Sequence, residues 1–144
     1  MSEEINKIAP LAIDMVIDIV TCDLEDNLTK VAELMISHQV DSILVINSNK
    51  PVGIITEGVI VKLISEGKNP CEFIAKDVMV SSIYSVFSND RVFDIASQFE
   101  RTTINRLCVV DDDGNLIGII SKKSFDEFQN CLLSFKKRRK KSKS

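Results

Sequence analysis

The sequence has few of the residue patterns on which catalytic and metal sites depend. It contains one histidine, His38, and four cysteines, none of them in a Cys-x-x-Cys pair: Cys22, Cys71, Cys108 and Cys131. Zinc and redox motifs need closely spaced cysteines, so this spacing argues against both kinds of site. A lone histidine without an identifiable partner indicates no Ser-His-Asp or Cys-His site. We therefore expect no enzyme activity, no metal and four reduced thiols.

Long apolar runs are absent as well. No run approaches the roughly 18 residues needed to span a bilayer. The first residues, Met-Ser-Glu-Glu, are acidic and lack the apolar core of a secretory signal. A length of 144 residues with 44% hydrophobic residues suits one compact domain. These features predict a cytoplasmic protein with no membrane partner.

Positive charge is scarce except at the end of the chain. The formal net charge is −3, from 18 basic and 21 acidic residues. Seven of the 18 basic residues lie between Lys136 and Ser144, so 11 basic residues face 21 acidic ones in the rest of the chain. This balance is not that of a nucleic-acid-binding domain, which carries positive charge on a folded face. Residues 136–144 are predicted to be a disordered, solvated tail. A salt-sensitive contact with nucleic acid, a ribosome or an acidic partner, and docking on the acidic body, are the alternatives.

The most informative stretch of the sequence occurs twice. Residues 42–56 read SILVINSNKPVGIIT and residues 106–121 read RLCVVDDDGNLIGIIS. Each copy has a short apolar run rich in branched residues, a polar turn, and a second apolar run that ends in Gly-Ile-Ile-Thr or Gly-Ile-Ile-Ser. This pattern predicts a hairpin of two buried strands. Two copies form an internal repeat, which determines the fold.

The residues that flank the hairpins repeat too. Identical residues recur 64 positions apart before the turn and 65 positions apart after it. The extra residue falls at the hairpin tip, where insertions are tolerated best. The identical pairs are Met15 and Met79, Ile19 and Ile83, Asp26 and Asp90, Ala32 and Ala96, Val45 and Val109, and Gly53 and Gly118.

The first repeat is predicted to have the order β-α-β-β-α. A short helix over residues 5–13, interrupted by Pro10, precedes a strand over residues 17–21. Asp26 stands at an expected N-cap, and apolar residues 28, 31, 32 and 35 form one helical face. After the hairpin, apolar residues 59, 60, 63 and 64 predict a second helix, with Gly67 as its C-cap. Asn69 and Pro70 predict a short helical turn between the repeats.

The second repeat is predicted to have the same order. A strand is expected over residues 83–87, with Asp90 as the cap of a helix whose apolar face comprises residues 92, 95, 96 and 99. After the second hairpin, Ser121 is expected to cap a longer helix. The apolar stripe of that helix is Phe125, Phe128, Leu132 and Phe135.

The two copies in register resemble a tandem pair of CBS motifs over roughly residues 9–135. The resemblance implies an α/β (α+β) fold in which two β-α-β-β-α motifs are related by a pseudo-twofold axis. The sheets pack together and helices flank them. The expected parts are a lead-in (1–14), motif 1 (15–67), a linker and lead-in (68–78), motif 2 (79–135) and the basic tail (136–144). Members of this family commonly form dimers and often bind AMP, ADP, ATP or S-adenosylmethionine between their motifs.

Carried over to this sequence, the resemblance implies two clefts, each drawing on both repeats. The first is expected to comprise Met15, Ile19, Val20, Val40, Asp41, Ser42, Ser121, Lys122, Lys123 and Ser124. The second is expected to comprise Met79, Ile83, Tyr84, Ile104, Asn105, Arg106, Thr56 and Val59.

The sequence departs from the family pattern where an aspartate usually holds the ribose. Val59 and Ser124 occupy those positions. Valine accepts no hydrogen bond, and an unpartnered buried hydroxyl costs about 1–3 kcal/mol. Serine accepts one, so the first cleft is the better candidate for sugar recognition. Ser121 and Thr56 stand at predicted helix starts, and the start of a helix favours a bound anion. The alternative is that both residues serve only as helix caps.

Charges near the expected clefts oppose one another. Lys122 and Lys123 favour an anion in the first cleft while Asp41 opposes it, and Arg106 and Glu57 oppose each other in the second.

The run from Asp111 to Gly114 resembles a calcium loop, but the first and last ligand positions would be Val109 and Ile120, which cannot coordinate. It is predicted to be an exposed hairpin turn.

Two functions therefore remain open. One is a regulatory module that binds an adenosine-containing ligand and signals to a dimer or a partner protein. The other is an interaction module without a ligand, whose basic tail contacts nucleic acid or an acidic partner.

Overall fold

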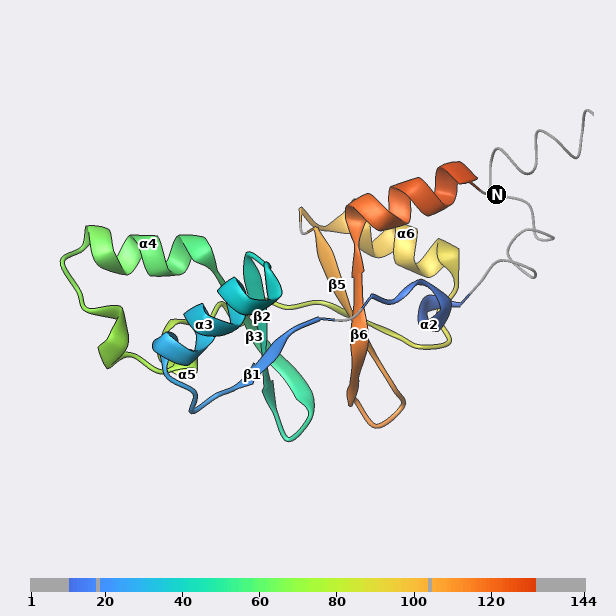
Figure 1. Cartoon of the computed structure of the whole chain (residues 1–144). Helices are drawn as coiled ribbons and strands as arrows, with labels where there is room; N and C mark the ends of the chain where they lie inside the picture. Colours follow the sequence, from blue (N-terminus) through green and yellow to red (C-terminus); the bar gives the residue numbers. More distant parts are fainter. Residues whose placement is uncertain (1–10, 18, 104, 132–144) are drawn as a thin grey trace, which may run out of the picture.

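A computed structural model describes residues 11–17, 19–103 and 105–131 (Figure 1). The first half contains α2 (Ala12–Met15), β1 (Thr21–Asp23), α3 (Leu28–His38), β2 (Ser42–Asn47), β3 (Lys50–Thr56) and α4 (Glu57–Ser65). The second contains η1 (Pro70–Glu72), α5 (Ala75–Val78), β4 (Ser85–Phe87), α6 (Val92–Arg101), β5 (Arg106–Val110), β6 (Leu116–Ser121) and a helix over residues 122–131. The predicted α/β fold with two β-α-β-β-α motifs is confirmed.

Each half forms one three-stranded sheet, in the order β1-β2-β3 and β4-β5-β6. The outer strands β1 and β4 run parallel to β2 and β5, whereas β3 and β6 are antiparallel to them. A parallel pair needs a crossover connection, which α3 and α6 supply. Each antiparallel pair is one of the two predicted hairpins.

The hairpin turns differ in length. Ser48 and Asn49 both have positive φ angles, 49° and 65°, in the two-residue turn between β2 and β3. This geometry matches the right-handed twist of the flanking strands. The turn before β6 is longer: Asp111 Oδ1 accepts hydrogen bonds from the backbone of Asp113 and Asn115, and Gly114 has φ 86°. The acidic run therefore forms a hairpin turn, as predicted, and the Asp111 carboxylate holds it by hydrogen bonds to the backbone of the same turn.

Two predicted helix caps are wrong by one residue. Asn27 is the N-cap of α3 and its side chain accepts a hydrogen bond from the Lys30 backbone, while α6 begins after Arg91. Asp26 and Asp90 instead accept hydrogen bonds from the backbone N–H groups three residues earlier, at 2.9 and 2.8 Å. These carboxylates fix the turns after β1 and β4. The bond from the Asp23 backbone, aided by Lys30, lowers the pKa of Asp26.

Two other predicted helix starts agree with the structure. Ser121 Oγ accepts a hydrogen bond from the Ser124 backbone at 3.1 Å, which confirms its capping role. Asn69 caps the short turn η1, as expected. Most of the helix expected over residues 5–13, and Leu132 and Phe135 of the last stripe, lie outside the described residues.

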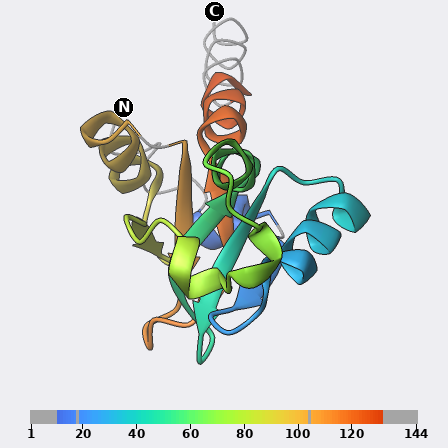
Figure 2. The same cartoon turned by 90° about the vertical axis from the view of Figure 1, so that its left-hand side faces the viewer.

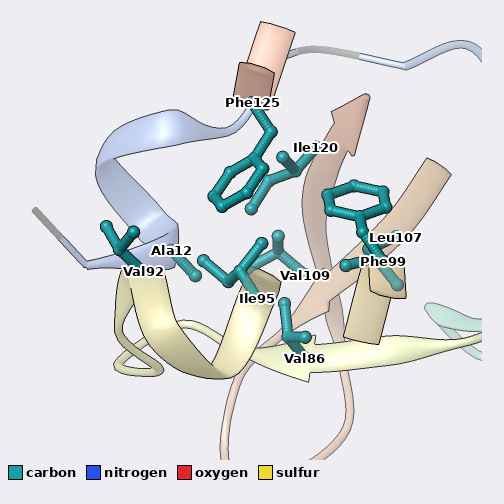
Figure 3. Packing of buried hydrophobic residues seen from close by; sticks show 9 residues of the cluster. All are labelled: Ala12, Val86, Val92, Ile95, Phe99, Leu107, Val109, Ile120 and Phe125. Atoms are coloured by element: carbon teal, nitrogen blue, oxygen red, sulfur yellow. The ribbon is translucent and has the colours of Figure 1, made fainter. Parts of the chain in front are cut away.

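Each half has its own apolar core. The second core contains Phe99 and Phe125, whose ring centroids lie 5.4 Å apart, together with residues from β4, β5 and β6 (Figure 3). The first core contains the equivalent face of α3 and the buried residues of β2 and β3. The predicted helical faces are thus the buried faces of α3 and α6.

The short helix before each repeat packs on the other repeat. Ala12 of α2 belongs to the second core and its N–H donates to Asp90 O at 2.8 Å. Ala75 of α5 belongs to the first core and its N–H donates to Asp26 O at 2.7 Å. The strand predicted over residues 17–21 is misplaced, since β1 shares only Thr21 with it, and the strand predicted over residues 83–87 is too long by two residues. In both cases the preceding segment crosses to the opposite sheet. The bridge between Ile17 and Ile119 marks one crossing.

Gly53 in β3 and Gly118 in β6 make room for these crossings. A Cβ atom on Gly53 would lie 2.5 Å from Met79 Sδ, and one on Gly118 would lie 2.9 Å from the backbone oxygen of Ile17. Both distances are too short for real contacts. The Gly-Ile-Ile pattern of each hairpin thus serves the exchange of segments between the halves.

The two sheets meet along their inner faces. Leu44, Cys108 and Ile119 form a small buried cluster between them, and Leu116 N donates to Asn49 O at 2.8 Å near the hairpin tips. The hairpins lie side by side in both views, with the helices on the outside (Figures 1 and 2). Among the described residues, no helix is long and apolar enough to cross a bilayer.

Candidate functional site

Two cavities open along the junction of the sheets. The first has a volume of about 600 Å³ and is lined by Ile17, Ile19, Val20, Met35, Ile36, Gln39, Val40, Asp41, Ser42, Glu57, Arg106 and Ile119. The second has a volume of about 220 Å³ and is lined by Ile19, Leu44, Ile54, Ser82, Ile83, Tyr84, Thr103, Asn105, Arg106, Cys108 and Ile119. Both repeats contribute to each cavity.

The cavities are equivalent under the internal repeat. Ile19, Val20, Gln39, Asp41 and Ser42 of the first cavity occur 64 positions before five residues that line the second. Those five are Ile83, Tyr84, Thr103, Asn105 and Arg106. The fold therefore builds the same hollow twice, once on each side of the sheet junction.

Differences at equivalent positions account for the smaller second cavity. Tyr84 replaces Val20 and Arg106 replaces Ser42, so two bulky side chains stand where the first cavity has small ones. The first cavity has room for a drug-sized ligand, since ligand sites typically measure about 300–1,000 Å³. The second, at about 220 Å³, lies below this range, so a ligand of that size would extend out of it.

Arg106 is the most connected polar residue of the site. Its Nη1 donates to Ser42 Oγ at 2.8 Å and its Nη2 donates to Asp41 Oδ1 at 3.2 Å. Ser42 is 6% exposed, so its hydroxyl needs a partner inside the protein. The guanidinium therefore joins the start of the second hairpin to the start of the first.

The residues expected in the first cleft divide into two groups. Ile19, Val20, Val40, Asp41 and Ser42 line the first cavity. The others lie elsewhere: Met15 packs against the second core, Lys122 and Lys123 are exposed, and the Ser121 hydroxyl donates to Ser124 Oγ at 2.8 Å.

The residues expected in the second cleft divide similarly. Ile83, Tyr84, Asn105 and Arg106 line the second cavity, and Arg106 also lines the first. Met79 lies against Gly53, and Val59 packs on the first core. Thr56 pairs with Ser42 across the first hairpin, and its side chain makes no capping bond. Ile104 lies outside the described residues.

The helix starts differ from the expected crosswise arrangement. Glu57 N donates to Asp41 O at 3.0 Å, and Lys122 N donates to Asn105 O at 2.7 Å. Each helix therefore begins beside the loop that precedes the hairpin of its own repeat, because the two strands of a hairpin start and end at the same edge. Glu57 accordingly lines the first cavity, whereas it was expected at the second.

The inward-facing hairpin residues were missed by the sequence analysis. Leu44, Ile54, Cys108 and Ile119 line one or both cavities. Their neighbours Ile43 and Ile55 are in the core of the first half. The alternation of strand side chains was a usable signal, because it places residues 44 and 54 on the opposite face of the sheet from the core.

No metal site is formed by the described residues: they contain no cluster of three or more His, Cys, Asp or Glu side chains able to hold an ion. Two of the thiols are buried and unreactive in character. Burial raises the pKa of Cys22 to about 11, with Asp26 and Asp23 adding to the effect, and raises that of Cys108 to about 11. All four cysteines are free thiols.

The comparison with protein families agrees with this architecture. The CBS domain matches twice, at residues 11–66 and 75–128. The chain belongs to the CBS domain family. The matched stretches begin at the crossing segments α2 and α5, so each CBS domain includes the short helix that packs on its neighbour.

Several curated proteins are similar in sequence to this chain, and two of them show how much of each protein is matched. An uncharacterised protein of Methanopyrus kandleri is 32% identical over 119 residues, which are 81% of this chain and 61% of that protein. The homoserine O-acetyltransferase of Methanococcus vannielii is 33% identical over 97 residues, 67% of this chain and 20% of that protein. The chain thus spans about a fifth to three fifths of these relatives.

Solved CBS structures share the fold at low sequence identity. CBSX2 of Arabidopsis thaliana in complex with AMP matches with a TM-score of 0.68 and 23% identity, covering 85% of this chain and 98% of that one. A CBS domain protein of Pyrobaculum aerophilum complexed with AMP matches with a TM-score of 0.67 and 19% identity, covering 79% of this chain and 88% of that one. A CBS pair in complex with 5′-methylthioadenosine and S-adenosyl-L-methionine matches with a TM-score of 0.68 and 20% identity, covering 85% of this chain and 97% of that one.

Proposed function

We propose that this CBS pair is a regulatory module that binds an adenosine-containing ligand, AMP, ADP, ATP or S-adenosylmethionine, between its repeats. The observation that carries the proposal is the pair of equivalent cavities, each lined by both repeats. A ligand seated there touches both halves at once. Solved CBS pairs with AMP or S-adenosyl-L-methionine bound support the choice of ligand class.

The lining suits such a ligand. Ile19, Val40 and Ile119 supply apolar surface for a flat base in the first cavity, while Asp41 and Ser42 supply oxygen atoms at its edge. Apolar walls with a few placed polar groups are typical of small-molecule sites. No catalytic step is part of the proposal, and the module acts by changing the arrangement of its two halves.

The signal is proposed to leave through the outer face of the first repeat. An apolar groove of about 450 Å³ runs between α3, α4 and η1, and Ile36 lines both this groove and the first cavity. A second copy of the chain, or a regulated partner protein, seated on this groove would contact a residue that also contacts the ligand. Binding at either place then influences the other.

Thermal unfolding with a panel of ligands tests the proposal. AMP, ADP, ATP or S-adenosylmethionine at saturating concentration is expected to raise the melting temperature, since a ligand at a hundred times its Kd stabilises by about 2.7 kcal/mol. GMP serves as the control for the base. Ile19→Trp fills both cavities and is expected to abolish the shift. No shift with any adenosine compound would contradict the proposal.

A further inference from the structure

A single guanidinium contributes to the walls of both cavities. Arg106 lines the first cavity and the second, and it binds Asp41 and Ser42 at the edge of the first. Its side chain is 38% exposed and that of Asp41 is 70% exposed. Exposed ion pairs contribute little to stability, so the Arg106 side chain can exchange Asp41 for another anion without a large penalty.

Charge differs between the cavities at three equivalent positions. Asp41 corresponds to Asn105, Ser42 to Arg106, and Glu57 to Lys122. Every change from the first repeat to the second makes the local charge more positive. The lining of the first cavity accordingly contains two carboxylates, whereas that of the second contains none. Lys122 lies beside the second cavity, because its N–H donates to Asn105 O.

We propose that Arg106 decides which ligand charge each cavity accepts and links the two cavities. This inference rests on the proposed function. The phosphate of an adenosine nucleotide in the second cavity binds the Arg106 guanidinium and draws it away from Asp41. The first cavity then presents Asp41 and Glu57 to an adenosyl ligand that carries positive charge, such as the sulfonium and ammonium groups of S-adenosylmethionine.

The chemistry of the groups supports this division. Arginine presents a planar fork of N–H donors that matches the oxygens of a phosphate, and such charge-assisted bonds are stronger than neutral ones. A phosphate in the first cavity would face the carboxylates of Asp41 and Glu57 at close range. A cationic ligand there is attracted to the same carboxylates once Arg106 no longer neutralises Asp41. Each ligand therefore favours binding of the other, and the effect is reciprocal.

Calorimetric titration of the full chain with adenosine, AMP and S-adenosylmethionine tests the role of Arg106. Arg106→Gln is expected to weaken AMP binding about tenfold or more, because a charge-assisted bond is lost. Adenosine, which has no phosphate, should bind as before, and S-adenosylmethionine should bind several-fold more tightly. Arg101→Gln removes the same charge from an exposed position of α6 and should change none of these affinities.

Exchanging the equivalent residues locates each ligand. Asn105→Asp is expected to weaken AMP binding several-fold and leave S-adenosylmethionine unaffected. Asp41→Asn should weaken S-adenosylmethionine binding several-fold and bind AMP at least as tightly as the wild type, because no carboxylate then competes for the Arg106 guanidinium. In the wild type, saturating AMP should tighten S-adenosylmethionine binding several-fold, and Arg106→Gln should abolish this effect. Asn105→Asp and Asp41→Asn remain informative if Arg106→Gln fails to fold, since both variants keep the Arg106 guanidinium.

The outcomes separate the two proposals. If adenosine, AMP and S-adenosylmethionine all fail to bind the wild type, the proposed function itself is wrong. If AMP binds the wild type and Arg106→Gln equally well, or AMP and S-adenosylmethionine compete for one site, the proposal for Arg106 is overturned while the binding function stands.

Discussion

At the scale of single residues, the buried thiols carry a pH dependence. Burial raises the pKa of Cys22 and Cys108 from 9.0 to about 11. A group with a raised folded-state pKa stabilises fully below its unfolded pKa and loses that contribution as the pH rises through the folded value. We expect the free energy of unfolding of the wild type to fall between pH 9 and 11. Measured from its own value at pH 7, each of the variants Cys22→Ala and Cys108→Ala should lose less than the wild type. Equal slopes in all three proteins would contradict this assignment.

The thiols also differ in reactivity. Cys71 and Cys131 are exposed, whereas Cys22 and Cys108 are buried. Alkylation at neutral pH, followed by peptide mapping, should modify the two exposed thiols rapidly and the two buried ones only on unfolding. Rapid modification of Cys108 would contradict its burial between the sheets. Scattered spacing predicted reduced thiols, but it gave no means of distinguishing the buried pair from the exposed pair.

At the scale of secondary-structure elements, the exchanged lead-ins depend on two glycines. Gly118→Ala would place Cβ 2.9 Å from a backbone oxygen, whereas Gly53→Ala would meet the flexible Met79 side chain. We expect Gly118→Ala to lower the free energy of unfolding by about 1–3 kcal/mol and Gly53→Ala to lower it less. Chemical denaturation measures both. Gly58→Ala in α4 is the matched control and should be neutral or stabilising by up to about 1 kcal/mol; equal losses in all three would contradict the account.

Most of these elements were predictable from the sequence. The apolar faces of α3 and α6 and both hairpins follow from local periodicity, which is why they were placed correctly. The caps at Asp26 and Asp90 were misplaced by one residue because aspartate serves equally well in the preceding turn. The crossing segments were not predictable, since their partners lie on the other repeat and local pattern carries no record of a distant strand.

At the scale of the whole molecule, two exposed isoleucines of the first repeat have polar counterparts in the second. Ile36 and Ile64 are 79% and 60% exposed, and the equivalent positions in the second repeat are Glu100 and Gln129. We expect self-association through the first repeat. Ile64→Lys should weaken the dimer at least tenfold in analytical ultracentrifugation because it places a charge in an apolar contact. Ile117→Lys, an exposed residue of β6, is the control. An unchanged sedimentation coefficient for Ile64→Lys would exclude this face.

The site was predictable in part. The residues just before each hairpin, such as Asp41 and Asn105, were expected at the clefts from the resemblance to CBS motifs, and they line the two cavities. The helix starts were expected on the opposite clefts, and the structure places Glu57 beside Asp41 instead. The Arg106 contact across the junction could not have been foreseen, since two residues 64 positions apart meet only after the halves have docked.

The most direct test of the central claim is an amide-resolved NMR titration of the full chain with adenosine. Ligand binding between the repeats predicts perturbed signals from both halves, concentrated at Ile19, Asp41, Ile83 and Asn105, with little change along the exposed face of α6. The claim would be contradicted by an unperturbed spectrum at saturating adenosine, or by changes confined to one repeat.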